Sequence, residues 1–152
     1  MRLWLLRHGE AEPRARTDAE RNLTDAGRLE VQRNAECLIG VPLEAILASP
    51  FQRAQQTAEL VRETLGFAGA VETVPWLTPE SDLNASMLYL DRHVEKHILL
   101  VSHQPFIGAL GGWLINGHRE SPLPMATASL AELKGDELAA GLMHLASLRH
   151  AN

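Results

Sequence analysis

Cysteine is almost absent from this chain of 152 residues, which contains only Cys37. A single cysteine excludes an internal disulfide framework and is typical of proteins that work in a reducing compartment. The sequence also lacks a run of about 18 apolar residues, the length that a membrane-spanning helix requires. Its N-terminus has none of the features of a secretory signal peptide. We therefore expect a cytoplasmic protein with no membrane partner.

Positive charge is in the minority. The 14 lysines and arginines are outnumbered by 19 aspartates and glutamates, which gives a formal net charge of −5. Nucleic acids and anionic membranes are bound by basic surfaces, so neither is an expected partner. Local charge still matters for a small anion, and the N-terminal region is rich in arginine: Arg2, Arg7, Arg14, Arg16, Arg21 and Arg28.

Short apolar runs alternate with amphipathic stretches along the chain. The runs predict buried strands over residues 3–6, 43–49, 70–74 and 98–102. Apolar residues at helical spacing predict helices over residues 25–39, 52–65, 83–94 and 105–116, with Thr24 and either Ser81 or Asp82 as N-caps. Alternation over 127–133 and 138–148 predicts an antiparallel hairpin at the sheet edge. This order predicts one domain, residues 1–152, with a three-layer α/β/α architecture and a mostly parallel sheet.

A loop over residues 10–22 follows the first strand. It is rich in alanine, charge and proline and has no clean periodicity. Connections are usually about 4–6 residues long, and longer ones are often functional.

Polar side chains follow three of the predicted strands: Arg7 and His8, then Ser49 leading to Arg53, then His103 after Ser102. The carboxyl ends of parallel strands lie at one edge of a sheet, where ligands bind in open α/β folds. Arginine offers a planar fork of donors that matches phosphate oxygens, and histidine can donate a proton or expose a lone pair. The pattern predicts a pocket for a tetrahedral dianion, although Arg53, judged from local sequence alone, is more typical of a solvated helix residue.

Two other kinds of site fit the sequence poorly. Ser49 and Ser102 lie outside the Gly-x-Ser-x-Gly pattern of serine hydrolases. The remaining histidines have no carboxylate or cysteine at metal-site spacing, so we expect them to be exposed and expect no metal or cofactor: His93, His97, His118, His144 and His150.

Taken together, the motifs resemble those of the histidine phosphatase superfamily, which includes the phosphoglycerate mutases and acid phosphatases. They occur in family order: Leu6-Arg7-His8-Gly9-Glu10, Leu23-Thr24-x-x-Gly27, Ser49-Pro50-x-x-Arg53-x-x-x-Thr57-Ala58 and Val101-Ser102-His103. The short length and Leu77-Thr78-Pro79 are most similar to the SixA-type phosphohistidine phosphatases. The resemblance implies a phosphoglycerate mutase-like fold.

The resemblance also implies roles for four residues. His8 is the expected nucleophile, transiently phosphorylated, and Arg7, Arg53 and His103 complete the phosphate pocket, with His103 protonated. To attack phosphorus His8 must be neutral, so its other ring nitrogen is expected to donate to a backbone carbonyl near Gly9.

The proton donor is the point of departure from the family, because this chain has no insertion after the third strand to supply one. The candidates are Glu80, Asp82 and Glu10, and each also has a structural explanation: loop surface, helix cap and pocket rim. A missing acid suits a P–N substrate, since a protonated imidazole leaves readily and an alkoxide does not.

The leading hypothesis is therefore hydrolysis of phosphohistidine on a protein of the phosphorelay or phosphotransfer type. The alternative is a phosphatase of small phosphate esters or sugar phosphates, and a non-catalytic phospho-binding module comes third. The sequence leaves the oligomeric state open, with a monomer as the simplest expectation.

Overall fold

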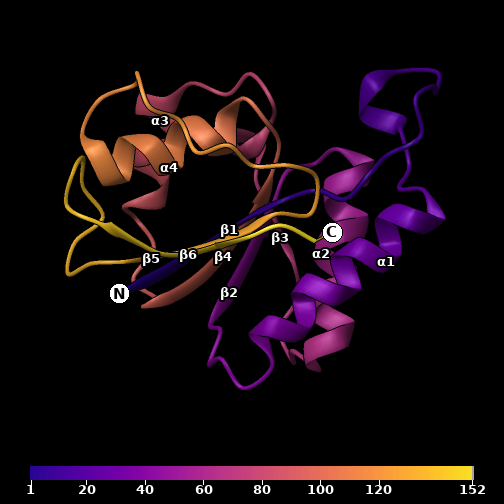
Figure 1. Cartoon of the computed structure of the whole chain (residues 1–152), viewed down its shortest axis with the longest axis horizontal. Coiled ribbons are helices and arrows are strands. Elements are labelled where there is room, and N and C mark those ends of the chain that lie inside the picture. Colours follow the sequence, from indigo (N-terminus) through magenta and orange to yellow (C-terminus); the bar gives the residue numbers. More distant parts are fainter. Residues whose placement is uncertain (152) are drawn as a thin grey trace.

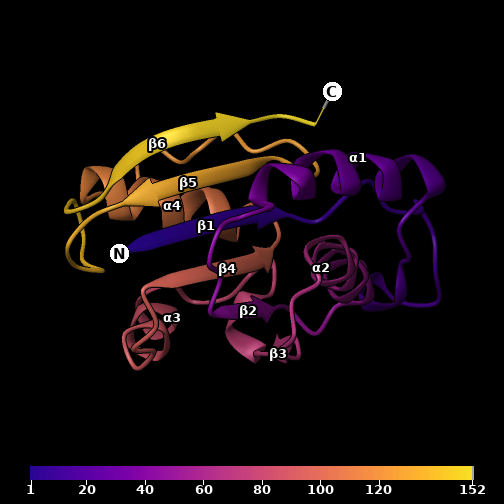
Figure 2. The ribbon, with the colours of Figure 1, turned by 90° about the horizontal axis from the view of Figure 1, so that it is seen from below.

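The structure is a computed structural model that describes residues 1–151. Over these residues six strands form one sheet in the order β3-β2-β4-β1-β5-β6 (Figure 2). β1, β2, β3 and β4 run parallel, whereas β5 is antiparallel to both β1 and β6. The predicted mixed sheet with a C-terminal hairpin at its edge is confirmed. The strand bounds are Arg2–Arg7 (β1), Ala45–Ala48 (β2), Glu72–Thr73 (β3), His97–Ser102 (β4), Leu130–Lys134 (β5) and His144–Arg149 (β6).

Helices cover both faces of the sheet, which confirms the three layers (Figure 1). On one face lie α1 (Asp25–Ala35) and α2 (Gln52–Leu65), and on the other α3 (Leu83–Leu90) and α4 (Phe106–Asn116). Three short 3₁₀ turns complete the described structure: η1 (Asp18–Glu20), η2 (Glu36–Leu38) and η3 (Pro75–Leu77). No helix over residues 1–151 has both the length and the apolar character needed to span a bilayer.

The helix ends follow from local sequence. The Thr24 hydroxyl accepts a hydrogen bond from the N–H three residues later, at 2.9 Å, and the Asp82 carboxylate caps α3 in the same way at 2.8 Å. These caps satisfy N–H groups that have no partner inside the helix. Gly66 and Gly117 end α2 and α4 in the left-handed region, at φ of 62° and 76°.

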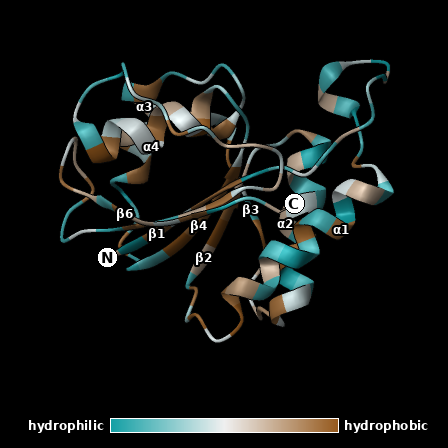
Figure 3. Ribbon diagram, in the orientation of Figure 1, coloured by the Kyte–Doolittle hydropathy of each residue, from teal (hydrophilic) through white to brown (hydrophobic). Residues whose placement is uncertain are grey.

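β1 runs through the centre of the core. All four side chains from Leu3 to Leu6 are at most 2% exposed, as expected for a parallel strand covered on both faces. Leu3 and Leu5 pack with residues of α3 and α4, whereas Trp4 and Leu6 pack with residues of α1 and α2. Figure 3 shows the hydrophobic colouring gathered along the strands, with hydrophilic colouring on the outer surfaces of α1 and α2.

Several predicted elements are shorter in the structure, among them β3, α3 and β6. β3 comprises two residues. α3 ends at Leu90, so Val94, assigned to that helix by its spacing, is 90% exposed in the connection to β4. β6 starts only at His144, because the preceding backbone bonds to α4 and not to β5: the N–H groups of Gly141 and Met143 donate to carbonyls of that helix. The spacing of apolar residues in the sequence does not indicate which element the backbone bonds to.

The loop after β1 lies so close to the first turn of α1 that only glycine fits at positions 9 and 27. A Cβ on Gly27 would overlap the backbone carbonyl oxygen of Glu10, and a Cβ on Gly9 would lie 2.7 Å from the carbonyl oxygen of Gly27. We expect Gly27→Ala to lower the free energy of unfolding by about 1–3 kcal/mol, measured by urea denaturation.

The sign of the stability change in Gly27→Ala distinguishes a close contact with the loop from an open helix position. In an open helix, Gly→Ala stabilises by about 1 kcal/mol. Gln32→Ala, at an exposed position of the same helix, is the control and should change the stability little. A more stable Gly27→Ala protein would contradict the close contact between α1 and the loop.

Candidate active site

Four of the predicted site residues meet at the carboxyl edge of the sheet. Arg7 ends β1, His8 follows it, and His103 follows β4, the parallel neighbour of β1. Arg53 lies in the first turn of α2, which starts just after β2. Arg7, His8 and Arg53 line a cavity of about 460 Å³, and the His103 ring lies 5.0 Å from the His8 ring, centroid to centroid.

His8 is held as a neutral imidazole in a defined tautomer. Its side chain is buried, with Nδ1 2.7 Å from the carbonyl oxygen of Gly9 and Nε2 3.3 Å from Nε of Arg53. The arginine Nε always carries hydrogen, so Nε2 of His8 accepts and Nδ1 donates. The hydrogen bond expected near Gly9 is thus present. Burial, together with the charges of Arg53 and Arg7, lowers the pKa of His8 to about 4 despite the opposing effect of that hydrogen bond.

His103 is also neutral in this arrangement. It is 1% exposed, its Nε2 lies 2.8 Å from the Ser49 hydroxyl, and its Nδ1 is buried without a hydrogen-bond partner among residues 1–151. Burial lowers the pKa of His103 to about 3, followed by the charge that His8 carries once it is protonated and by the charge of Arg53. A protonated His103 is expected for the transition state and stays a prediction there; before an anion binds, burial among cations opposes a further positive charge on the ring.

Arg53 is buried and held from several sides, unlike a solvated helix arginine. Its side chain is 5% exposed, Nη1 donates to the backbone carbonyl of Asp18 at 2.7 Å, and Nη2 lies 3.1 Å from the Asp18 carboxylate. The guanidinium carbon lies 5.2 Å from the centre of the Phe51 ring. A planar cation fixed in this way is well suited to binding an oxyanion.

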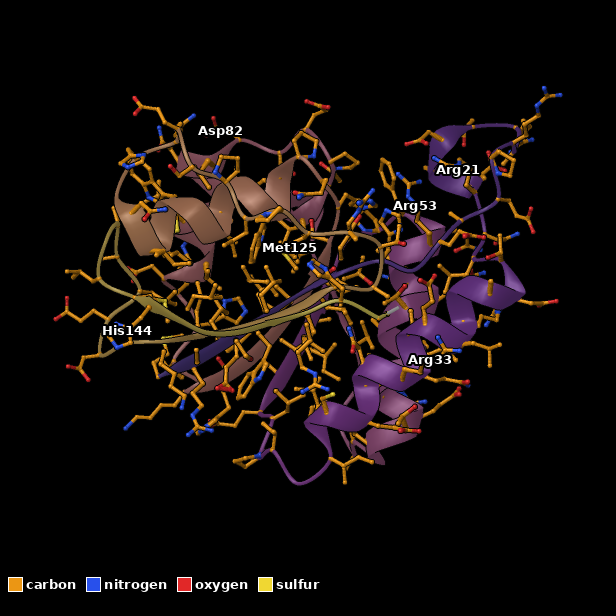
Figure 4. All side chains as sticks on the ribbon, viewed as in Figure 1. Arg21, Arg33, Arg53, Asp82, Met125 and His144 are labelled. Carbon is orange, nitrogen blue, oxygen red and sulfur yellow. The ribbon has the colours of Figure 1, made fainter. Side chains whose placement is uncertain are left out.

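Asp18 joins two arginines in the cavity. Its second carboxylate oxygen accepts a hydrogen bond from Nη1 of Arg21 at 2.9 Å. The hydrogen bond from Arg21, with those from Arg53, lowers the pKa of the Asp18 carboxyl group, although burial acts against this. The unliganded pocket thus contains a carboxylate that balances part of its positive charge. Figure 4 shows Arg21 and Arg53 on the same side of the molecule.

Arg7 is positioned by the chain that precedes β5. Its Nη1 donates to the carbonyl of Met125 at 3.0 Å, while its Nε is buried with no partner among the described residues. Burial, and then the charge of Arg53, lowers the pKa of Arg7. Arg7 Nε and His103 Nδ1 are two polar atoms that an oxyanion in this pocket can satisfy.

Thr57 connects the nucleophile strand to the arginine helix. Its buried hydroxyl donates to the carbonyl of Arg53 at 2.7 Å and accepts from the N–H of Gly9 at 3.1 Å. One side chain therefore fixes the end of β1 against the first turn of α2.

The three candidate acids lie in different places. Glu10 lines the same cavity as His8, and its carboxylate accepts a hydrogen bond from the Thr24 hydroxyl at 2.9 Å. Glu80 and Asp82 line a neighbouring cavity of about 290 Å³, which shares only Pro79 with the first. Asp82 is in addition the N-cap of α3, and Figure 4 shows it well apart from Arg53.

Sequence reasoning missed two residues of the cavity, Asp18 and Arg21. Both lie in or beside the loop over residues 10–22, whose unusual length was the available signal. Arg21 was noted only as part of the arginine-rich N-terminal region. No feature of the sequence indicates that the backbone of Met125 holds Arg7.

Two of the other histidines are less exposed than predicted. His93 and His97 are half-buried, with ring nitrogens 3.6 Å from Glu72 and 3.2 Å from Glu44. Their neighbouring strands and turns cover them, which local sequence does not reveal. His118, His144 and His150 are exposed as expected. Over residues 1–151, no three or more His, Cys, Asp or Glu side chains are grouped so as to hold a metal ion.

Known proteins with related sequences and structures share this arrangement of elements. A model of the histidine phosphatase superfamily (branch 1) matches residues 3–78. The phosphohistidine phosphatase SixA of Escherichia coli is 35% identical over 142 residues, which cover 90% of this chain and 87% of the relative. A SixA homolog of Haemophilus influenzae is 30% identical over 160 residues, which cover 97% and 96%.

A solved structure gives the same answer. The protein histidine phosphatase SixA complexed with tungstate superposes with a TM-score of 0.89 at 33% identity, covering 99% of this chain and 97% of that one. The chain belongs to the histidine phosphatase superfamily. The phosphatase class and the phosphoglycerate mutase-like fold inferred from the motifs are confirmed.

The depressed pKa values of the two site histidines can be checked directly. We expect the rings of His8 and His103 to remain neutral from pH 8 down to about pH 5, whereas an ordinary exposed imidazole titrates near 6.5. A ¹⁵N and ¹H NMR titration of the unliganded protein measures this, with His8→Gln and His103→Gln spectra for assignment. Titration of either ring near pH 6.5 would contradict the burial described above.

The same shifts determine how stability depends on pH. In the unfolded chain both imidazoles bind protons near pH 6.5, but in the folded protein they do so only near pH 4 and 3. The free energy of unfolding contributed by this difference is therefore complete above pH 6.5 and decreases as the pH falls toward 4. Urea denaturation at stepped pH measures the decrease, which should be smaller in His8→Gln.

Proposed function

We propose that this protein is a phosphatase that hydrolyses phosphohistidine on other proteins through a covalent intermediate on His8. The observation that carries the proposal is the state of His8: a buried, neutral imidazole whose Nε2 lone pair faces arginine donors in a cavity. A nucleophilic imidazole must be neutral with a lone pair that the substrate can reach, and of the two neutral site histidines His8 lines the cavity, whereas Nε2 of His103 contacts the Ser49 hydroxyl.

The reaction proceeds in two displacements. Nε2 of His8 attacks phosphorus, and the P–N bond to the substrate imidazole breaks with its electron pair returning to that ring, which keeps or takes a proton from solvent. Water then attacks the phosphorus on His8, the second P–N bond breaks, and inorganic phosphate leaves. As Nε2 bonds to phosphorus the His8 ring becomes cationic, and the Gly9 carbonyl at Nδ1 stabilises that charge.

The charge on the transferred phosphoryl group is met by fixed donors. Arg7 and Arg53 lie beside His8, and Arg21 lines the same cavity. When phosphate enters, the Asp18 carboxylate gives up its contact with Arg53, and the Arg53 Nε–H leaves the His8 lone pair. Positive charge held in place before the reaction requires no reorganisation in the transition state.

The leaving group favours a P–N substrate. The only candidate acid in the cavity with His8, among Glu10, Glu80 and Asp82, is Glu10, and its carboxylate accepts a hydrogen bond in the unliganded site. A substrate imidazole can instead be protonated from solvent before the P–N bond breaks.

The relatives support the same substrate class, since two that are similar over most of the chain are named a phosphohistidine phosphatase SixA and a homolog of it. We propose a phosphorylated protein of the phosphorelay or phosphotransfer type as partner, and the cytoplasm as the place of action. We treat residues 1–152 as a single domain, in agreement with the one sheet over residues 1–151.

The test of the nucleophile is His8→Ala. Turnover of a ³²P-phosphohistidine protein should fall by about 10³-fold or more, and acid-labile labelling of the enzyme should disappear. His144→Ala, at an exposed position on β6, is the matched control and should retain both. Full activity of the His8→Ala protein would remove His8 from the mechanism.

The second candidate function is hydrolysis of small phosphate esters, which the presence of Glu10 in the cavity favours. The discriminating variant is Glu10→Gln, assayed on a phosphohistidine protein and on small phosphomonoesters. If Glu10 is only a rim carboxylate, the ratio of ester to phosphohistidine turnover stays unchanged. A general acid contributes about 10²–10⁴-fold, so selective loss of ester turnover by that amount, with faster ester turnover in the native protein, supports the alternative.

A further inference from the structure

Ser49 is the buried polar residue of the site that the mechanism leaves unused. It follows β2 and is completely buried. Its backbone is already held, since its N–H donates to the carbonyl of Val101 at 3.1 Å and its carbonyl accepts from the Gln55 side chain at 2.7 Å. The hydroxyl is therefore not needed to keep the residue in place, and its own contacts call for an explanation.

The hydroxyl has two neighbours. Oγ accepts a hydrogen bond from the N–H of Phe51 at 3.2 Å and lies 2.8 Å from Nε2 of His103. A backbone N–H can only donate, so the first contact occupies a lone pair of Oγ and leaves its single hydrogen free. The only acceptor that the described residues offer to this hydrogen is Nε2 of His103.

The two tautomers of His103 differ in the number of buried polar groups that are left without a hydrogen-bond partner. If Nε2 carries the ring hydrogen, it donates to Oγ, and both the serine hydrogen and the Nδ1 lone pair are left buried without partners. If Nδ1 carries it, the serine donates to Nε2 and only the Nδ1 hydrogen lacks a partner. Each unmade hydrogen bond of a buried group costs about 1–3 kcal/mol, so the second tautomer is favoured.

We propose that Ser49 is a positioning residue that holds neutral His103 with its hydrogen on Nδ1, so that this N–H is available to a phosphoryl oxygen. The proposal deepens the phosphatase function and rests on it. Ser49 accepts from the Phe51 backbone and donates to Nε2, which determines the nitrogen that carries the hydrogen. His103 then acts as a hydrogen-bond donor without becoming an imidazolium.

The charges around His103 make a neutral donor favourable. The charges of Arg53 and Arg7 disfavour a positive charge on the ring, whereas the charge of Asp18 favours one. The centroids of the His8 and Phe51 rings each lie 5.0 Å from the centroid of the His103 ring. A neutral N–H adds a donor for the substrate without adding charge repulsion before the substrate arrives.

The first test needs no substitution. ¹⁵N NMR of the unliganded protein, with ¹⁵N-labelled histidine and a His103→Gln spectrum for assignment, distinguishes protonated from unprotonated ring nitrogens. We expect Nδ1 of His103 to be protonated and Nε2 to be unprotonated at pH 7.5. The opposite pattern overturns the proposal, whatever the enzyme's activity.

The second test is Ser49→Ala. Loss of the hydroxyl should allow the Nε2–H tautomer, lower kcat by about 10- to 100-fold, and raise the inhibition constant for tungstate by a similar factor. Ser49→Thr retains a hydroxyl and should restore both the tautomer and the activity. Ser86→Ala, which removes a buried serine hydroxyl in α3, is the matched control and should change neither.

The outcomes distinguish this proposal from the phosphatase function. If His8→Ala loses turnover but Ser49→Ala keeps native kcat and tungstate inhibition, the tautomer proposal fails and the function stands. If His8→Ala keeps turnover, the function itself fails. If Ser49→Thr packs poorly, the NMR tautomer of the native protein still decides.

Discussion

The crowding of positive charge at one edge of the sheet is the constraint on which the rest of the site depends. Arg7 and Arg53 lie beside His8 with little access to solvent, and each lowers the pKa of its neighbours. The structure meets this constraint in two ways: it keeps both imidazoles neutral, and it places one carboxylate, Asp18, between Arg53 and Arg21. Neutral His8 can then act as a nucleophile. The Asp18 carboxylate accepts hydrogen bonds from arginine donors that an incoming phosphoryl group will use. The reactivity of His8 and the reduced repulsion among the clustered cations thus have the same origin.

Much of the fold could be predicted because its central strands and helix caps are encoded locally. Leu3 to Leu6 form a run that is typical of a strand covered on both faces. Thr24 begins α1 through its hydroxyl, and Gly66 ends α2 through its left-handed backbone. The meeting of Arg7, Arg53 and His103 could be predicted because parallel strands end at a common edge. The element ends were less predictable. Val94 continues the spacing of α3 but lies in an exposed turn, because the chain has to turn into β4.

What the sequence could not reveal depends on contacts between distant segments. Asp18 and Arg21 reach the cavity only because the loop over residues 10–22 folds back over Arg53, and a loop without periodicity gives no indication of its path. The protonation state of His103 before an anion binds depends on burial and on the charges around the ring, which local sequence does not give. Of the candidate acids, Glu80 and Asp82 line a different cavity from the one that His8 lines. The residue types indicate the chemistry of the site, whereas the protonation states of its histidines depend on the packed structure.

The Thr57 hydroxyl, which joins the Gly9 N–H to the Arg53 carbonyl, gives the pocket a fixed width. The nucleophile and its principal cation belong to segments 45 residues apart, yet one oxygen atom sets the spacing between their backbones. The nucleophile and its principal cation are thus connected through one hydroxyl, whereas the carboxylate that pairs with this cation comes from a separate segment, the loop over residues 10–22.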